Sequence, residues 1–564
     1  MVTTPNSMKF LKFMENGFTK ENVEFWLKHI EPSFGVVKYD KSTRFFNGNL
    51  VQSSYQLLNT LNLSREECAS LLKPSIDYLT TIRNDYDFLR FHFKEAFNSK
   101  NGDESFKKDK ERSNIIINFL NKNSEFQYTK LFLDFRNDIV EDFKNDLQQG
   151  HILLPGTNAT IFGNGPEMLL ELAGEFSLEK QNKSGILGVG EIACNKFKNK
   201  EQVVCARSPH ITMGNIYCAT NNLSNDIWKY FDLGDNIVCI NAIGENIQYR
   251  LNGCDYDSDS MLITNDSLIV NKAFLEKDNF IVPVCKIEPK KQNFSLAELD
   301  YFNSNNKIGE IINLSQKINC HIWEKYHNNE DITMIYNDVC KLAVLSGIEI
   351  DKAKRAYENI NASEEINNIR RKYDKDNIYP KFFKKIKQVS SNDEKKVEYR
   401  FFNSAMEQIY EISSNIRFAK GKPKNAIHKN IIDLISKPLN YSFDINLRDN
   451  IIEDCKKYCK FIKLNQINIR KASSDEQKVL YNKFKIMKER INNKIIEKLN
   501  SESIIYSILE YFTDNNITNF YMYEPILRSK LINKLIINNK SNLKNVIYNE
   551  NGQYKLYCLS FSKE

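Results

Sequence analysis

The sequence has few of the residues and motifs that build zinc sites. Only seven of its 564 residues are histidines, and no H-E-x-x-H motif occurs. The twelve cysteines include no C-x-x-C pair, and the closest two, Cys455 and Cys459, are four residues apart without a nearby histidine. A zinc site is therefore poorly supported.

Long apolar runs are also lacking, and residues 1–13 do not have the pattern of a secretory signal. We therefore expect a cytoplasmic protein with reduced thiols and no membrane partner. The glycine-rich segments 162–167 and 185–191 lack the G-x-x-x-x-G-K-[ST] order of a nucleotide-binding P-loop. We interpret both as turns between strands.

Composition indicates a folded protein with several domains. Hydrophobic residues make up 41% and aromatic residues 12% of the chain, which is typical of packed cores. The net charge of +7 is modest for this length. Basic residues therefore carry a functional message only where they cluster.

Glycine is unevenly distributed, and this predicts a change of architecture along the chain. About half of the 20 glycines fall between residues 151 and 285. Short apolar runs alternate with them and read as strands, with a helical exception at 167–176; the runs are 152–154, 186–189, 202–206, 237–240 and 267–270. This pattern favours a compact β-barrel with tight turns.

Helical periodicity dominates on both sides of the glycine-rich part. Apolar residues recur at three-and-four spacing from 52 to 148, with a polar interruption at 98–112 that we expect to be an exposed loop. Helical patterns resume at 308–321 and run nearly to the C-terminus. We therefore expect an α+β protein with four parts: an N-terminal segment (1–50), a helical connector (51–148), a barrel (149–285) and a helical C-terminal region (286–564).

The most informative segment is residues 251–261, which contains Asp255, Asp257 and Asp259. Two carboxylates about 4 Å apart repel by about 4 kcal/mol at an effective dielectric constant near 20, so such a trio calls for a cation. Hard oxygen ligands select Mg²⁺, Mn²⁺ or Ca²⁺. Mg²⁺ held by few carboxylates keeps positions for phosphate oxygens, so the segment points toward phosphoryl transfer.

Two other interpretations of this segment stay open. An Asp-rich turn can be a solvated loop, although the flanks at 249–251 and 261–263 are apolar and predict strands that fix it. A calcium loop of the EF-hand kind would place the three carboxylates at its first, third and fifth positions. That pattern fails at Ser260, where glycine is needed, and at Asp266, where a bidentate glutamate is expected.

About fifty residues upstream lies a second motif, Arg207-Ser-Pro-His-Ile-Thr-Met-Gly-Asn215. An arginine facing the same substrate as the acidic trio would neutralise a phosphate while the metal polarises another. Arg207 and His210 are therefore candidate phosphate contacts.

In this order, the two motifs resemble the second double-psi β-barrel of the two-barrel RNA polymerases. The silencing-type RNA-dependent RNA polymerases carry a basic residue-Asn-Pro-Cys-Leu-His-Pro-Gly-Asp run before Asp-Leu-Asp-Gly-Asp, and the large subunit of DNA-dependent RNA polymerase is similar. This chain departs from the pattern at Ser258, where the family has glycine. A weaker similarity covers 342–354, and a second covers the segment from Asn47 to Leu63, with Gln52 and its Leu-Leu-Asn run.

The resemblance implies that Asp255, Asp257 and Asp259 hold catalytic Mg²⁺ or Mn²⁺ between an RNA 3′ hydroxyl and a nucleoside triphosphate. It also implies a first barrel with basic residues, of which only residues 35–41 could be the last strand, making Lys38 and Lys41 candidates. We therefore expect half of a split or truncated polymerase with a protein partner that supplies the first barrel. Four basic residues could track a nucleic-acid backbone or line a solvated loop: Arg417, Lys420, Lys422 and Lys424.

The expected function is Mg²⁺-dependent, template-directed nucleotidyl transfer to an RNA 3′ end, with a nucleic-acid template, an RNA product and nucleoside triphosphates as partners. One alternative is a nucleic-acid-binding or scaffolding subunit whose barrel has lost catalysis. Another is a metal-dependent nuclease, which would degrade its substrate without added nucleotides.

Overall fold

In this computed structural model the described residues are 19–29, 45–99, 107–177, 185–224, 226–286, 290–291, 295, 297–298, 300–301, 307–351, 355–356, 360–373, 377–386, 397–418, 429–471, 474–540 and 543–564. The chain divides into two compact units, Met1–Lys41 and Ser42–Glu564. Helix α2 (Lys20–His29) belongs to the first unit. All elements described below belong to the second.

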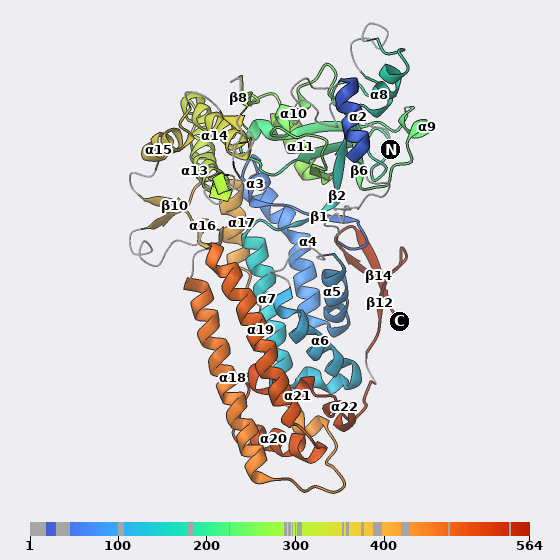
Figure 1. Cartoon of the computed structure of the whole chain (residues 1–564), viewed down its shortest axis with the longest axis vertical. Helices are drawn as coiled ribbons and strands as arrows, with labels where there is room; N and C mark the ends of the chain where they lie inside the picture. Colours follow the sequence, from blue (N-terminus) through green and yellow to red (C-terminus); the bar gives the residue numbers. More distant parts are fainter. Residues whose placement is uncertain are drawn as a thin grey trace. The chain divides into compact units, whose positions relative to one another are not determined.

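Six strands form a closed barrel between residues 153 and 264 (Figure 1). They are β2 (Leu153–Phe162), β3 (Glu191–Ala193), β4 (Gln202–Ala206), β5 (Tyr217–Asn221), β6 (Ile237–Ile240) and β7 (Ser260–Thr264). Their order is β2-β6-β3-β5-β4-β7, and the pairing of β2 with β7 closes the ring. Strands β2 and β6 are parallel, as are β3 and β5, while the other pairs in the ring are antiparallel. Strand β1 (Leu50–Gln52) pairs with β2 outside the ring.

Side chains along each strand point alternately into the barrel and away from it, and the inward ones fill its interior. On β2, Ala159 and Ile161 are buried while the residues between and beside them are partly exposed. They join one apolar cluster with side chains from the other barrel strands, including Val203, Tyr217 and Val238. This is the inward and outward alternation expected of a small barrel filled by side chains.

The strand predictions are confirmed at 202–206, 237–240 and 261–263, and the run 152–154 is the start of β2. Two others are wrong. Residues 186–189 form bends and turns before β3. Residues 267–270 begin helix α11 (Ser267–Glu276), because the Asp266 side chain accepts hydrogen bonds from the backbone N–H groups of Leu268 and Ile269 and caps a helix.

The predicted strand at 249–251 is also wrong, since a short helix, α10 (Ile247–Arg250), precedes the acidic segment. The helical exception in the barrel is confirmed as α8 (Gly165–Leu172). The remaining short elements are α9 (Ile227–Tyr230), α16 (Phe383–Ile386), α22 (Ile532–Leu535), β8 (Lys290–Lys291), β9 (Arg355–Ala356), β10 (Ile378–Pro380) and β11 (Glu398–Arg400).

The connector is helical, as predicted. It contains α3 (Tyr55–Leu58), α4 (Arg65–Asn84), α5 (Tyr86–Ser99), α6 (Lys107–Lys122) and α7 (Lys130–Gln148). Helix α4 begins with a capping box in which Ser64 and Glu67 satisfy each other's backbone N–H groups. The loop predicted for 98–112 is wrong at both described ends, since α5 continues to Ser99 and α6 begins at Lys107.

The C-terminal region contains eight longer helices among its described residues. They are α13 (Ile308–His327), α14 (Thr333–Asp351), α15 (Ala362–Tyr373), α17 (Ala405–Ser414), α18 (Ile445–Lys471), α19 (Ser474–Lys498), α20 (Glu502–Asp514) and α21 (Phe520–Arg528). The region ends in an antiparallel sheet that the sequence reading did not predict: β12 (Val546–Tyr548), β13 (Tyr554–Leu556) and β14 (Leu559–Lys563).

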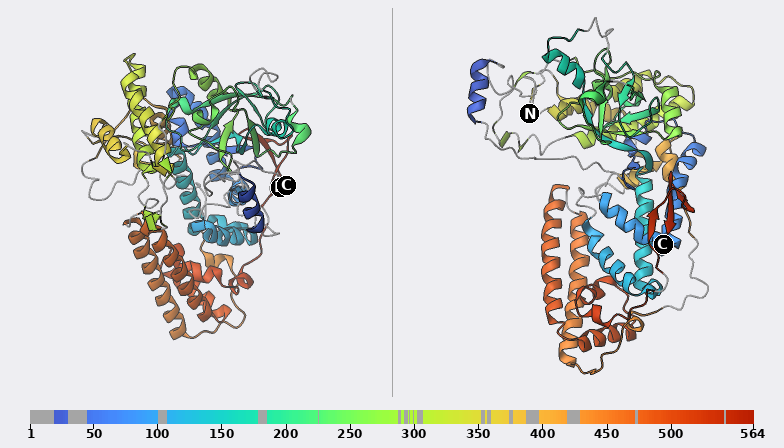
Figure 2. Two further views of the ribbon diagram at one scale, coloured as in Figure 1. Left: turned by 45° about the horizontal axis from the view of Figure 1, so that its top comes forward. Right: turned by 90° about the vertical axis from the view of Figure 1, so that its right-hand side faces the viewer.

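This terminal sheet returns to the connector and shares its core (Figure 2). Phe561 of β14 is fully buried against Phe88 and Phe91 of α5. Lys563 binds the carboxylate of Asp87 at 3.0 Å. One hydrophobic core therefore joins parts of the chain that the predicted boundaries at 148 and 286 separate, and the α+β class with helical regions on both sides of the barrel is confirmed.

Closure of the barrel depends on Gly156, whose φ of +150° lies where only glycine is unstrained. A Cβ at this position would lie 2.2 Å from the carbonyl oxygen of Ile263 on the closing strand. We expect Gly156→Ala to lower the free energy of unfolding by about 2 kcal/mol or more in chemical denaturation. The control Gly309→Ala, in helix α13 with no atom within 4 Å of the added Cβ, should be neutral or stabilising. Equal stability of the two variants would contradict this role for Gly156.

Candidate metal centre

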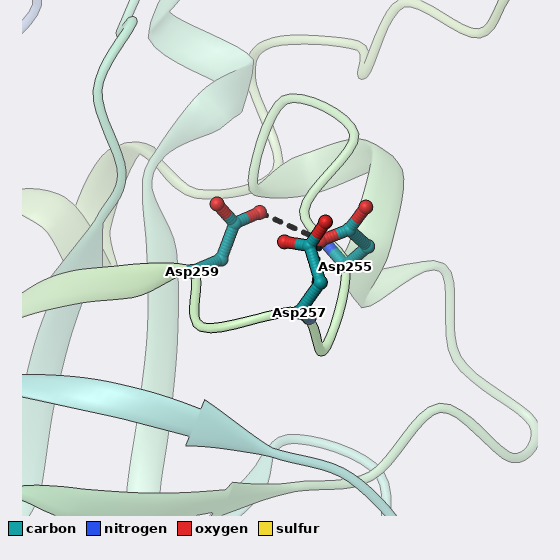
Figure 3. Close-up of side chains that lie close together, drawn as sticks. All are labelled: Asp255, Asp257 and Asp259. Carbon is teal, nitrogen blue, oxygen red and sulfur yellow. Dashed lines mark hydrogen bonds between the residues drawn. The ribbon is translucent and has the colours of Figure 1, made fainter. Parts of the chain in front are cut away.

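The three aspartates lie on the short loop between α10 and the closing strand β7, and their carboxylates converge (Figure 3). One oxygen from each of Asp255, Asp257 and Asp259 lies within 4.8 Å of the others. The backbone N–H of Asp255 donates to Asp259 Oδ2 at 2.9 Å, and that of Asp257 donates to Asp255 Oδ1 at 3.3 Å. The loop thus folds so that its own amides orient two of the three carboxylates.

Left-handed backbone conformations make this loop tight. Asn252 has a φ of +54°, Gly253 of +70° and Ser258 of +94°. Ser258 stands where the resembling family has glycine, and it adopts the conformation for which glycine is preferred, at a strain cost of about 1 kcal/mol or more. The substitution has therefore not removed the turn.

Arg207 lies directly against the acidic loop. Its Nη2 atom is 2.8 Å from Asp259 Oδ2, and its Nη1 atom donates to the Asn252 carbonyl at 3.0 Å. Its side chain is only 14% exposed. Arg207 thus fixes both the carboxylate and the backbone of the loop, and the predicted contact with a substrate phosphate stays a prediction.

Further hydrogen bonds lock the two sequence motifs together. The side-chain amide of Asn252 donates to the Pro209 carbonyl at 2.7 Å, and that of Asn215 donates to the Arg250 carbonyl at 3.0 Å. Arg250 Nη1 donates in return to the Ile216 carbonyl at 3.3 Å. The arginine motif and the acidic motif therefore form one unit, as their order in the sequence led us to expect.

Tyr256 anchors the loop on its other side. Its ring packs on the backbone of Gly163, at the turn after β2, where an added Cβ would lie 2.8 Å from the ring. Burial raises the pKa of the Tyr256 hydroxyl to about 12. The sequence analysis treated Gly163 as an ordinary turn residue and missed this contact, for which one sequence carries no signal.

Electrostatics at the loop favours a cation. Burial raises the pKa of Asp255, and its interaction with the neighbouring Asp257 raises it further. Asp255 and Asp257 are nevertheless exposed to solvent, so their oxygens are accessible to an ion. A set of three carboxylates with accessible oxygens fits a hard divalent cation such as Mg²⁺, and among the described residues it is the one group of three or more acidic, His or Cys side chains that could hold a metal ion.

His210 is buried, with an exposed fraction of 1%. Its Nε2 atom is 2.9 Å from Thr60 Oγ1, and its backbone N–H donates to the Gln56 side chain at 2.9 Å. Burial lowers the pKa of His210 to about 4. The side chain ties the arginine motif to the connector, and its predicted contact with a substrate phosphate stays a prediction.

Helix α13 supports the same motif from a third side. Gln316 donates from its side-chain amide to the His210 carbonyl at 3.1 Å, and Asn319 donates to the Ile211 carbonyl at 2.9 Å. Both side chains are fully buried. The helical pattern at 308–321 predicted this helix, but it did not single out these two positioning residues.

Other predicted site residues lie apart from this centre or cannot be placed. Arg417 is exposed. The next residue, Phe418, packs against the connector, where its ring centre lies 5.1 Å from the guanidinium carbon of Arg83. The remaining basic candidates fall outside the described residues: Lys38, Lys41, Lys420, Lys422 and Lys424.

Of the three comparisons with known proteins, the one with solved structures found matches. No protein-family model matches the chain, and no curated protein matches it. Among solved structures it is similar to the RNA dependent RNA polymerase QDE-1 from Thielavia terrestris, with 13% sequence identity and a TM-score of 0.42. The similarity covers 88% of this chain and 57% of that one, so the chain spans little more than half of that polymerase.

Within the described ranges, none of the helices combines the length and apolar character required to span a membrane.

The buried His210 predicts a pH dependence of stability. Because its pKa in the folded state is about 4, below the ordinary value of about 6.5, only the unfolded chain takes up this proton near pH 5. The stabilisation of the folded chain by its neutral His210 is complete above pH 6.5, and it is lost as the pH falls toward 4. Relative to His210→Gln, the wild-type chain should lose about 2 kcal/mol of unfolding free energy between pH 7 and pH 5 in urea titrations. An identical pH dependence of the two proteins would contradict the burial of a neutral imidazole.

Proposed function

We propose that this chain is the catalytic part of a Mg²⁺-dependent, template-directed RNA polymerase that transfers nucleotides to an RNA 3′ end. The observation that carries the proposal is the convergence of Asp255, Asp257 and Asp259 within 4.8 Å on a loop fixed to a closed barrel. Spacing and order of this loop and the arginine motif resemble the two-barrel polymerases.

The three aspartates are the residues that would hold Mg²⁺ or Mn²⁺. When bound there, such an ion supplies Lewis acidity to phosphate oxygens and favours ionisation of an attacking hydroxyl. The chain itself contributes a preorganised ligand set, because backbone amides and Arg207 hold Asp255 and Asp259 before any ion arrives. Little reorganisation is then required during the reaction.

Arg207 has two roles in this proposal. It positions Asp259 and the Asn252 carbonyl in the structure, which a residue without a fixed guanidinium fork would do less well. The guanidinium also has further N–H groups, and these would contact a phosphate of the substrate beside a metal ion held by the aspartates.

We further propose that a partner chain supplies the first barrel and its basic residues. The chain spans 57% of the polymerase to which it is similar, and the described residues contain one closed barrel. In this proposal Lys38 and Lys41 contact the phosphates of the substrate. Arg417, Lys420, Lys422 and Lys424 contact the nucleic-acid backbone.

Replacing two of the ligands tests the proposed chemistry. In the complex isolated from its native source, Asp257→Asn with Asp259→Asn should lower metal-dependent incorporation of ribonucleotides about a thousandfold or more, because two anionic ligands are lost. Incorporation is measured as extension of a labelled RNA primer on a template.

The matched control is Asp232→Asn with Asp235→Asn, which removes two exposed charges from the same barrel region outside the centre. This control should retain wild-type incorporation. Extension by the aspartate-centre variant at the wild-type rate would refute the assignment, and full template-directed synthesis by the purified chain alone would refute the partner hypothesis. Degradation of the RNA without added nucleotides would favour a nuclease instead.

Metal binding can be measured separately from catalysis. Mg²⁺ or Mn²⁺ at about ten times its dissociation constant should stabilise the wild-type chain by about 1.4 kcal/mol, seen as a rise in Tm. The Asp257→Asn and Asp259→Asn double variant should show no such rise. Without metal the double variant loses the ion pair of Asp259 with Arg207 and gains relief from carboxylate repulsion, so the quantity to compare is the metal-induced shift in each protein. Equal metal-induced shifts in the two proteins would show that the ion binds elsewhere.

A further inference from the structure

The positive charge of the chain is concentrated in one pair of helices. Helices α18 and α19 together contain 14 Lys and Arg residues and seven Asp and Glu residues. Their net charge of +7 equals that of the whole chain, so the rest of the chain is neutral. Such an asymmetry indicates an anionic partner for this hairpin of helices.

On α18 the cations form a stripe on the solvent face, which we call the α18 stripe: Lys456, Lys457, Lys460 and Lys463, all exposed. The opposite face of the helix carries Cys455, Tyr458 and Ile462, which are buried in the core shared with the connector. The helical period of 3.6 residues accounts for this separation.

The charges of the α18 stripe are largely uncompensated. Lys457 lies 3.9 Å from Glu453, an exposed pair worth little in water. Lys456, Lys460 and Lys463 make no ion pair with any residue that the structure describes. Neighbouring lysines without acidic partners repel one another, and a bound polyanion would reduce this repulsion.

Helix α19 has a second exposed stripe, which we call the α19 stripe: Lys483, Arg490 and Lys494. Spacings of seven and four residues place these three on one face, about 100° around the helix from the buried Phe484 and Ile495. Within the described ranges they too have no acidic partner. In Figures 1 and 2, α18 and α19 run side by side, so both stripes belong to one long hairpin.

We propose that the α18–α19 hairpin binds the phosphate backbone of a nucleic acid. From Lys456 to Lys463 the α18 stripe extends about 10 Å at a rise of 1.5 Å per residue. Duplex nucleic acid carries roughly one charge per 1.7 Å of axis, so four cations over this length meet several phosphates. The proposal rests on the proposed function only for the choice of nucleic acid as the polyanion.

An anionic membrane fits the hairpin less well. Helices that lie on membranes insert a broad apolar face among the lipids. The broad apolar face of α18 is buried in the protein core and is not available to lipids. Apolar residues that are exposed on the hairpin, such as Leu464, Ile486 and Met487, lie beside the lysines, and the comparison with lipid vesicles below tests whether they matter. Contact with a phosphate backbone requires only the lysines.

The test is the salt dependence of binding to a fluorescently labelled RNA duplex of roughly 20 base pairs, measured by anisotropy with the full chain between about 50 and 200 mM salt. Lys456, Lys457, Lys460 and Lys463 are all changed to Gln. The affinity should fall at least about tenfold, and the slope of log affinity against log salt should decrease in magnitude by about three to four. Changing Lys483, Arg490 and Lys494 to Gln should decrease the slope by about two to three.

The matched control changes four exposed lysines elsewhere to Gln: Lys94, Lys530, Lys540 and Lys555. It removes the same charge and should leave the slope within about one of wild type. Equal losses in the control and in the α18 variant would overturn the proposal, as would binding to vesicles of anionic phospholipid in preference to RNA. Loss of metal-dependent incorporation by the aspartate-centre variant is measured independently, so failure of one proposal is distinguishable from failure of the other.

Discussion

The candidate metal centre depends on the way in which strand β7 closes the barrel. This strand pairs with β2 on one side and with β4 on the other. Asp259 immediately precedes it, and its carbonyl accepts a hydrogen bond of 2.8 Å from the backbone N–H of Ile161 on β2. The last residue of the acidic trio is therefore held by the closing sheet, and the preceding loop is short enough to bring Asp255 back to it. Bringing three carboxylates together costs free energy because they repel one another. The backbone hydrogen bonds between the barrel strands keep the loop from spreading apart.

Three layers of the molecule meet behind this loop. The arginine motif contacts the acidic loop through Arg207, and the motif itself is held by His210 from the connector side and by Gln316 and Asn319 from helix α13. The connector supports the motif through Thr60, helix α13 supports it through Gln316 and Asn319, and all three side chains are buried. Connector, barrel and C-terminal region thus act on one site, which is why a description by separate domains misses its construction.

Much of the site could be predicted from the sequence, and the rest could not for identifiable reasons. The spacing of the aspartates and the glycine-rich composition around them depend on local chemistry, which a single sequence carries. The run 267–270 was read as a strand because short apolar runs do not distinguish strand from helix, whereas the cap at Asp266 decides for a helix. Contacts such as that of Tyr256 with Gly163 join residues distant in sequence, and no local pattern marks them. The same applies to the terminal sheet, whose core is supplied by the connector.

Charge balance explains why the site is stable without an ion and still suited to one. Three ionised carboxylates carry a charge of −3, and Arg207 reduces this to −2, which a single divalent cation neutralises. Without Arg207 the repulsion would spread the loop, and with a second cationic side chain in contact the remaining charge would be only −1, too little to neutralise a divalent cation. Asp255 and Asp257 are exposed, so the residual negative charge lies on the solvent side of the loop, where an ion has access to their oxygens. The arrangement is therefore that of a partly compensated site that Arg207 holds in shape and that has oxygen ligands and charge suited to a divalent cation.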